Sequence, residues 1–374
     1  MERRRFIGTA GLAGIFAAGM APAVHAAQAI RWRLASRLPK TMDIPHSGVQ
    51  TFIRQVKEMS GGKFEISLFA TDELAPGAGV LDSVQRGSVE CGHTSASYYI
   101  DKDAAFALDS AIPFGMNARQ TAAWMQYGNG LALLREFYKG YGIVNFPMGN
   151  TGAQMGGWYR KPVRALADLK GLKMRIAGLG ADVLERLGGK PDYLSSNETF
   201  AALKRGSIDA AEWSSPHDDL KLGLHDVCKH YAFPGWWKGG AQYSLYINRR
   251  AYDALTEENQ AIVESAAAAA HLDILAQYDM KNPLALRELA ATGTQLAPLP
   301  KSVLDAAWKV AQGLFAELAD KNPQWKKIHA SYAAFLSDQG WNHAERGFAG
   351  YMHERQLQTL AEEKRKKSAP AKRR

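Results

Sequence analysis

The sequence predicts an α/β protein made of two similarly built lobes with a ligand cleft between them. Predicted strands and helices alternate along the chain, and two short segments recur in the same order. GGK occurs at 61–63 and again at 188–190, and QRGSVEC at 85–91 is matched by KRGSIDA at 204–210. Each of these segments lies at the end of a predicted helix. Ligands usually bind such folds in the cleft, at the carboxyl ends of the strands.

The first predicted lobe begins with a strand, because apolar residues alternate with polar ones over 30–34. Helical spacing of apolar residues over 49–59 predicts a helix, and alternation over 64–68 predicts a second strand. A helix around 77–86 then leads to a strand near 89–91. This βαβαβ order predicts a parallel sheet covered by helices.

The second half of the chain is predicted to be mostly helical after a strand at 243–247. A long helix is expected over about 256–291, with Thr256 as its N-cap and acidic residues in its first turn. Its length suits a strut that crosses both lobes or a helix that reaches a partner subunit. Further helices are expected at 302–320 and 342–363.

These elements give the expected lobe boundaries. The first lobe is predicted to contain 27–150 with part of 247–285, and the second 151–246 with 286–361. At 348 residues after removal of the first 26, the chain is long enough for two such domains.

Residues 1–26 have the pattern of a secretory signal: a basic start, a short apolar run and a small-residue cleavage pattern ending at Ala26. The segment from Arg3 to Ile7 also matches the twin-arginine export signature, although a general secretory signal with three arginines is an alternative. Both predict an exported, periplasmic protein with the signal cleaved near Ala26.

The net charge of +9 comes from the two ends of the chain. Residues 1–26 account for two of these charges and 364–374 for seven, which leaves the body between them neutral. Nucleic-acid binding requires a basic face on the fold, so we expect no nucleic-acid partner. The basic tail is predicted to be a disordered extension.

Lys173–Ile176 reads as a strand that enters a glycine turn at 178–180 and then a helix at 181–187. The single G-x-G is too weak for a dinucleotide site, because Val183 stands where a third glycine belongs. What remains is a helix N-terminus beside Arg175, an arginine able to hold a carboxylate with two hydrogen bonds. A surface ion pair is an equally good explanation of Arg175 from the sequence.

The histidines, aspartates and cysteine between 217 and 230 could suggest a transition metal, but their spacing fits no compact zinc pattern. We interpret them as the polar face of an amphipathic helix. The chain also lacks a G-x-S-x-G elbow and a phosphate loop, so no local motif indicates an enzyme.

Gln154 and the pair Glu212-Trp213 offer oxygen ligands for a hard cation or hydrogen bonds for a polar ligand, and buried structural groups are the alternative. The stretch FPGWWKGGAQ, which contains Trp236 and Lys238, could be a stacking platform, a membrane anchor or a pocket wall. The neutral body and the repeated lobes favour the pocket wall.

Together, several segments resemble the periplasmic solute-binding proteins of TRAP (tripartite ATP-independent periplasmic) transporters over about residues 30–345. They are GGKFEISLF, QRGSVECGH, NTGAQMGGWYRK, DLKGLKMRIAGLG, GSIDAAEW and FPGWWKGGAQ. The resemblance implies a periplasmic-binding-protein-like fold whose two lobes close on an organic acid. It also implies delivery of that acid to a membrane permease.

The resemblance assigns roles to individual residues. It implies that Arg175 clamps the ligand carboxylate, and Trp213 after Glu212 is similar to the α-keto-acid-binding branch. In that branch Gln154, Glu212 and Trp213 would help to hold Na⁺ or Ca²⁺. A further acidic ligand is expected where this chain has Lys238, so we expect no metal cofactor and an ammonium that pairs with Glu212 and the ligand. The alternative is that Lys238 turns to solvent and Na⁺ or Ca²⁺ stays on Gln154 and Glu212.

We therefore expect capture of a small organic acid (an α-keto, hydroxy, aromatic or ring-amide monocarboxylate) rather than catalysis. The alternative is a periplasmic lyase or dehydrogenase in the same cleft, with Glu212 as its base. The long C-terminal helix could also support a homodimer. The residues expected to bind the ligand are Arg175, Gln154, Glu212, Lys238, Trp213, Trp236, Trp158, Tyr98 and Tyr99.

The two cysteines, Cys91 and Cys228, lie in different predicted lobes. A disulfide between them would hinder closure of the lobes on a ligand. We therefore expect free thiols.

Overall fold

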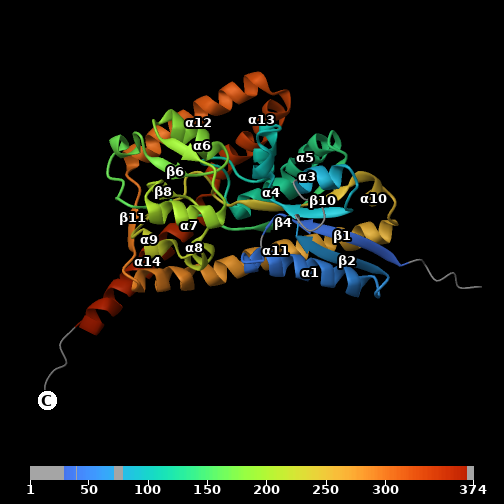
Figure 1. The fold of residues 1–374 in the computed structure, drawn as a ribbon, viewed down its shortest axis with the longest axis horizontal. Coiled ribbons are helices and arrows are strands. Elements are labelled where there is room, and N and C mark those ends of the chain that lie inside the picture. The colour runs from blue at the N-terminus through green and yellow to red at the C-terminus, as the bar shows by residue number, and fades with distance from the viewer. Residues whose placement is uncertain (1–28, 39, 71–78, 369–374) are drawn as a thin grey trace, which may run out of the picture.

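A computed structural model describes residues 29–38, 40–70 and 79–368 and has two α/β lobes that lie side by side (Figure 1). The first contains a five-stranded sheet in the order β2 (Phe64–Ala70), β1 (Ile30–Ser36), β3 (Cys91–Thr94), β10 (Gln242–Asn248), β4 (Ile143–Asn150). The second contains a six-stranded sheet in the order β11 (Gln295–Pro298), β9 (His230–Phe233), β5 (Trp158–Tyr159), β8 (Ala210–Ala211), β6 (Lys173–Arg175), β7 (Lys190–Asp192). The predicted two-lobed α/β fold is confirmed.

The two lobes repeat one plan. In the first lobe β2, β1 and β3 are parallel, and in the second β7, β6 and β8 are parallel in the same order. Each set is followed by an antiparallel strand, β10 in one sheet and β5 in the other. The connecting helices are α1 (Asp43–Met59) and α3 (Val80–Gln85) in the first lobe and α6 (Leu179–Arg186) and α7 (Ser196–Arg205) in the second.

The recurring sequence segments correspond to the same structural device in both lobes. Gly87 follows α3 with φ 71°, and Gly206 caps α7 with φ 75°. A side chain would strain this left-handed backbone, which glycine adopts freely and which ends a helix before the next strand. The remaining residues of each segment then enter β3 or β8.

The long predicted helix exists as α11 (Glu257–Ala291), and the Thr256 side chain accepts a hydrogen bond from the Asn259 amide at 3.3 Å. The helix packs against α1 and β4 of the first lobe and against α8 (Pro216–Leu222) of the second. It therefore runs beneath both lobes as a strut (Figure 1).

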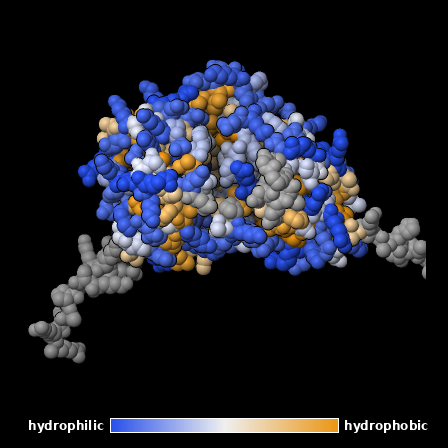
Figure 2. Space-filling model, viewed as in Figure 1, coloured by the Kyte–Doolittle hydropathy of each residue, from blue (hydrophilic) through white to orange (hydrophobic). Residues whose placement is uncertain are grey.

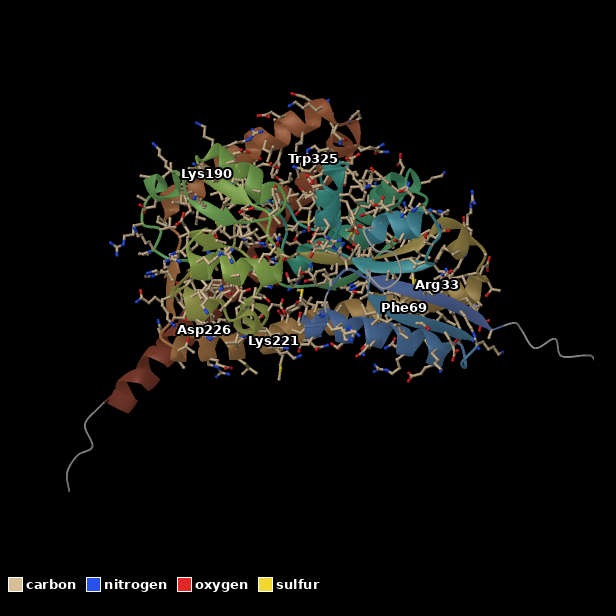
Figure 3. All side chains as sticks on the ribbon, in the orientation of Figure 1. Arg33, Phe69, Lys190, Lys221, Asp226 and Trp325 are labelled. Carbon is tan, nitrogen blue, oxygen red and sulfur yellow. The ribbon has the colours of Figure 1, made fainter. Side chains whose placement is uncertain are left out.

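The C-terminal helices connect the lobes on another side. Helix α12 (Lys301–Lys321) packs on α6, whereas α13 (Pro323–Asp338) packs on α5 (Gly130–Lys139) of the first lobe. Trp325 is fully buried and donates a hydrogen bond from its indole to the Phe315 carbonyl (3.2 Å), which fixes the turn between α12 and α13 (Figure 3).

The remaining elements are short except for α14, which extends away from the lobes (Figure 1). They are the 3₁₀ helices η1 (Ala96–Tyr99), η2 (Ala104–Asp109), η3 (Leu166–Leu169) and η4 (Gln339–Trp341), and the α-helices α4 (Ala118–Tyr127), α9 (Leu224–Val227), α10 (Arg249–Asp253) and α14 (His343–Ser368).

The structure differs from three expected boundaries. Strand β10 pairs with β3 and β4, so residues 242–246 belong to the first sheet, although the expected range 151–246 placed them in the second lobe. Helix α13 likewise packs on the first lobe. Helix α14 continues to Ser368, so 364–368 of the expected disordered tail are helical. Residues 369–374 and the predicted signal at 1–26 lie outside the described residues.

The visible surface is mostly hydrophilic, with hydrophobic residues in small patches (Figure 2). Charged side chains such as Lys190, Lys221 and Asp226 lie on the outside of the second lobe (Figure 3). Within the described part of the chain, no helix combines the length and apolarity needed to span a bilayer.

Candidate ligand-binding site

Arg175 and Glu212 meet at the carboxyl ends of neighbouring strands in the second lobe. Parallel pairing of β6 with β8 sets Arg175 opposite Ala211, and the Glu212 amide donates to the Arg175 carbonyl at 2.8 Å. The Arg175 Nη1 donates to the Glu212 carbonyl (2.7 Å) and to its Oε2 (3.0 Å), while Nε donates to the Leu194 carbonyl (3.1 Å). The guanidinium is thus held by backbone as well as by the carboxylate.

Lys238 reaches the same carboxylate from the loop that follows β9. Its Nζ donates to Glu212 Oε1 at 2.7 Å. The loop is pinned by Gly235, whose amide donates to the Gln154 carbonyl at 3.0 Å, and a Cβ at Gly235 would lie only 2.6 Å from that oxygen. Close backbone approach therefore requires glycine here and directs the lysine inward.

The resulting cluster is nearly buried and carries an excess positive charge. The Glu212 side chain is 1% exposed, and those of Arg175 and Lys238 are 13% exposed each. Two cations share one carboxylate, so one positive charge is not neutralised within the cluster. A buried charge without a partner is costly, so this arrangement favours binding of an anion.

Arg175 keeps a donor for that anion. Its Nη2 has no hydrogen-bond partner among the residues that the structure describes, because the hydrogen bonds of the guanidinium come from Nη1 and Nε. The guanidinium carbon also lies 4.8 Å from the centre of the Trp213 ring. Stacking on an aromatic face fixes the guanidinium plane without using its donors.

Tyr98 of η1 is a side chain of the first lobe that lies near this cluster. Its ring lies 5.1 Å from the Arg37 guanidinium carbon, and about half of the residue is exposed. Enclosure of the hydroxyl raises its pKa, whereas the charges of Arg175 and Arg37 act to lower it. The hydroxyl is therefore within electrostatic reach of the second lobe.

Gln154 contributes a buried polar group beside the lysine loop. Its Nε2 donates to the Thr151 hydroxyl at 3.2 Å, and Thr151 in turn accepts from the Ala241 amide. Gln154 Oε1 is buried and has no partner within the described residues. An unpaired buried acceptor is unfavourable and suits a donor on a ligand or a neighbouring side chain.

The other predicted aromatic residues have packing roles in the structure. The buried Tyr99 hydroxyl pairs with Thr94 Oγ1 (3.0 Å). Trp158 stacks on Tyr231 with 4.0 Å between ring centroids and donates to a carboxylate of α8. Trp236 stacks on Phe114, with 5.6 Å between ring centroids. Trp158 is completely buried, and Tyr99 and Trp236 are each 5% exposed, so the contacts of these rings are with the protein interior.

The segment after Glu212 was misinterpreted as the polar face of one amphipathic helix. Gly223, with φ 72°, separates α8 from α9, and Asp218 and Asp219 are buried. The Ser214 amide donates to Asp219 Oδ1 (3.0 Å) and its hydroxyl to Asp218 Oδ2 (2.9 Å). These carboxylates hold the loop that carries the site.

Burial raises the pKa of Asp219 to about 7, although hydrogen bonds from Tyr231 and Trp158 act in the opposite direction. Sequence reasoning missed this support. The available signal was Pro216 at the start of a helix followed by two acidic residues in its first turn, a common helix N-terminus.

Both cysteines are free and buried, as expected. Burial raises the pKa of the Cys228 thiol to about 11, opposed by the charge of Arg160. The thiols are therefore protonated at neutral pH, and no disulfide joins Cys91 in the first lobe to Cys228 in the second.

The residues present fit a resident metal ion poorly. Both oxygens of Glu212 already accept hydrogen bonds from cations, and a further positive ion would lie against Arg175 and Lys238. Hard cations such as Ca²⁺ need six to eight oxygen ligands. Across the described ranges, no group of three His, Cys, Asp or Glu side chains could hold a metal.

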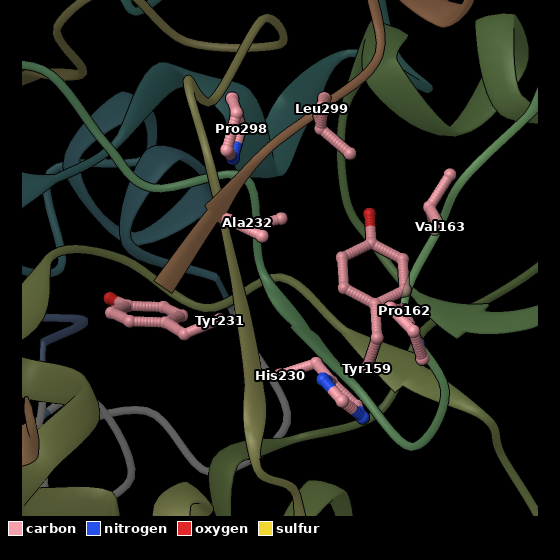
Figure 4. A pocket seen from close by; sticks show the side chains of 9 residues that line it. Tyr159, Pro162, Val163, His230, Tyr231, Ala232, Pro298 and Leu299 are labelled. Atoms are coloured by element: carbon pink, nitrogen blue, oxygen red, sulfur yellow. The ribbon is translucent and has the colours of Figure 1, made fainter. Parts of the chain in front are cut away.

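A separate small hollow lies beside the second sheet, between the loop after β5 and the strands β9 and β11 (Figure 4). It is lined mainly by apolar groups such as Val163, Ala232 and Leu299. It contains none of the charged residues of the cluster, so it is unsuited to an organic acid.

The strand-end cluster of arginine, glutamate and lysine on a two-lobed fold is accompanied by a match to a known family. Residues 36–322 match the family described as bacterial extracellular solute-binding protein, family 7. The chain belongs to this family. Its members named below are solute-binding proteins rather than enzymes, so the alternative of a lyase or dehydrogenase is not supported.

Similar proteins agree on the transport system. The chain is 45% identical over 306 residues, covering 82% of it and 84% of the relative, to a monocarboxylate 2-oxoacid-binding periplasmic protein of Nostoc sp.. It is 42% identical to a TRAP transporter solute-binding protein of Bordetella bronchiseptica, with a TM-score of 0.84 and coverage of 88% of this chain and 99% of that one.

A TRAP periplasmic solute-binding protein of Colwellia psychrerythraea is 33% identical, with a TM-score of 0.83 and coverage of 86% and 99%. The Bordetella protein contains calcium and picolinate, and the Colwellia protein contains calcium and pyruvate. The predicted membership of the TRAP solute-binding family is confirmed.

Proposed function

We propose that this protein captures a small organic monocarboxylate in the cleft and delivers it to the membrane permease of a TRAP transporter. The observation that supports this is the buried cluster of Arg175, Glu212 and Lys238, with its single excess positive charge. A monocarboxylate neutralises that charge. Nothing else in the site has to change its ionisation for the ligand to bind.

Arg175 is the proposed carboxylate clamp. Its Nη1 and Nε are held in place by Glu212 and the Leu194 carbonyl, which leaves Nη2 directed to the ligand. Pre-organisation of this kind lowers the entropy cost of binding. Trp213 and Trp236 would line the apolar side of the pocket, and Gln154 and Tyr98 would supply polar contacts.

The similar proteins support a 2-oxo or aromatic acid as the ligand. Their names and ligands comprise 2-oxoacids, pyruvate and picolinate, all of which are small monocarboxylates. In this chain we propose that the acid is bound without a resident metal cofactor, since the residues around Glu212 favour an anion over a cation.

The place of capture would be the periplasm. Family 7 proteins are extracellular, and residues 1–26 have the sequence of an export signal. A homodimer through the long helix α11 is a further proposal: Leu272 and Met280 of this helix are 66% and 64% exposed, and a second copy would cover them.

A thermal-shift screen of carboxylic acids tests the proposal. Pyruvate, lactate and picolinate should raise the melting temperature of the purified mature protein, because a ligand that binds only the folded state stabilises it. Arg175→Ala should abolish the shift, with an affinity loss of roughly a hundredfold for a charge-assisted contact to the ligand carboxylate.

Arg205→Ala is the matched control, since Arg205 is an exposed arginine on α7. It should respond to the acids like the wild type. An equal thermal shift in Arg175→Ala would contradict the clamp, and the lack of any shift in the wild type would contradict capture of these acids.

A further inference from the structure

The position beside Glu212 is occupied by a side-chain ammonium group, that of Lys238. Two similar proteins, at 42% and 33% identity, hold calcium together with a monocarboxylate. Here the Nζ of Lys238 lies 2.7 Å from Glu212 Oε1, and only 13% of the lysine side chain is exposed. A positive charge is thus built into this chain beside the carboxylate, whereas those relatives take up a calcium ion together with the acid.

We infer that the Lys238 ammonium acts as a tethered cation that replaces the metal ion, so that ligand capture is independent of Ca²⁺ and Na⁺. The inference rests on the proposed function and names how that site works. The ligand must then present a hydrogen-bond acceptor to the lysine.

Both oxygens of the Glu212 carboxylate are already occupied by cationic donors. Oε1 accepts from Lys238 and Oε2 accepts from Arg175, so a metal ion would have to displace one of two charge-assisted hydrogen bonds. Such bonds are about twice as strong as neutral ones. Gln154 Oε1 is a buried oxygen without a partner among the described residues, but a single amide oxygen cannot form the coordination shell of Ca²⁺.

Lys238 has more hydrogen-bond donors than Glu212 uses. An ammonium has three N–H donors and no acceptor. One donor is used by Glu212, and Lys238 Nζ makes no other hydrogen bond to a described residue. Since the enclosed site excludes most water, the two remaining donors need acceptors. A ligand oxygen supplies one of them.

These donors define the ligand class. The carboxylate of the acid would bind Arg175, and an acceptor on the neighbouring carbon, a 2-oxo or 2-hydroxy oxygen, would accept from Lys238. A metal ion would instead favour a ligand that chelates it with two groups, such as a carboxylate and a ring nitrogen. A dicarboxylate would leave one negative charge in excess of the cluster, so monocarboxylates are selected.

The test begins with the wild-type protein, freed of bound ligand and titrated with pyruvate by calorimetry. We expect the dissociation constant to agree within about twofold in EDTA and in excess Ca²⁺. Elemental analysis should find less than stoichiometric Ca²⁺ and Na⁺ after gel filtration. A tenfold or greater loss of affinity in EDTA that Ca²⁺ restores, or a stoichiometric metal, would overturn the inference.

Substitutions examine the lysine itself. Lys238→Met keeps a linear side chain without the donors and should weaken pyruvate binding by roughly tenfold or more in both buffers. Lys238→Glu should bind pyruvate only when Ca²⁺ is added. Lys204→Met and Lys204→Glu are controls on an exposed lysine of α7 and should bind like the wild type.

The outcomes separate the inference from the proposed function. Unchanged affinity in Lys238→Met, or Lys238→Glu that binds equally well with and without Ca²⁺, would overturn the tethered cation and leave carboxylate capture intact. Wild-type protein that binds no monocarboxylate would overturn both. Circular dichroism identifies a variant that has not folded, and the wild-type chelator experiment then still decides.

Discussion

The two lobes are built on the same strand order, yet they place opposite chemistry at the same position. Cys91 lies opposite Leu34 in the first lobe and Ala210 opposite Met174 in the second, so two residues further along each strand are His93 and Glu212. The buried His93 donates from Nε2 to the Met148 carbonyl (3.0 Å), and burial lowers its pKa to about 4. Glu212 binds two cations.

The difference indicates that the two lobes of this repeated fold have different roles in ligand binding. The first lobe keeps a neutral imidazole in this position and offers the half-exposed side chain of Tyr98, whereas the second lobe concentrates its charges around one carboxylate. Ligand affinity should therefore reside mainly in the second lobe, and the first should contribute closure and shape.

The largest loss of folding stability is expected from Glu212→Gln, which replaces the charged carboxylate at this position of the second lobe with a neutral amide. The change leaves the ammonium and guanidinium nearly buried without a counter-charge, and breaking such a pair costs about 3–5 kcal/mol of folding stability. Denaturant unfolding without ligand measures the loss. Glu317→Gln, which breaks the exposed pair with Arg186, should cost less than about 1 kcal/mol.

A similar cost for both variants would mean that the buried cluster is as weakly coupled as a surface pair. The two lobes would then differ in sequence at this position without a corresponding contribution of the cluster to folding stability.

A pH-dependent effect is expected at His93 of the first lobe. In the unfolded chain its pKa returns to about 6.5, so acid protonates the unfolded state before the folded one. Its contribution to stability is complete above pH 6.5 and is lost as the pH falls toward 4, by about 3 kcal/mol. His93→Gln should lack this loss.

The measurement is the difference in unfolding free energy between wild type and His93→Gln at several pH values from 7 to 4. The wild type should lose its advantage as the pH falls, and the exposed His353→Gln should track the wild type. A constant difference between wild type and His93→Gln would show that the imidazole titrates normally in the fold.

The smallest effect is expected from Tyr98→Phe. Removal of one neutral hydroxyl on the exposed side of the cleft should weaken pyruvate binding by about two- to tenfold, as for a single hydrogen bond. Calorimetry measures it, with the fully exposed Tyr127→Phe as the control. A loss as large as that of Arg175→Ala would assign recognition to both lobes equally.

Local signals made much of the fold predictable. Alternation near residue 30 and over 243–247 identified strands, and the cap at Thr256 fixed the start of the strut helix to within one residue. Local signals do not show which strands pair with one another. That β10 completes the first sheet depends on pairing between distant segments, which periodicity does not encode.

The candidate site was predictable to the same degree. Arg175, Glu212 and Lys238 were each identifiable as residues of interest, but their contacts span 37 and 26 positions of sequence. Only the fold brings the side chains to one carboxylate. Asp218 and Asp219 were misinterpreted because a charged pair in a short helix gives no sequence signal of burial.

The placement of β10 and β11 has a consequence for the order in which the protein can form. Strand β10 lies between β3 and β4, and β11 closes the far edge of the second sheet, although each follows the other lobe's residues in the chain. As the chain leaves the ribosome, β4 has no neighbour in its sheet until residue 248 has been made. The second sheet likewise lacks its edge strand β11 until residue 298 has been made. The lobes therefore mature together, late in synthesis, and neither is expected to fold when expressed as a contiguous half.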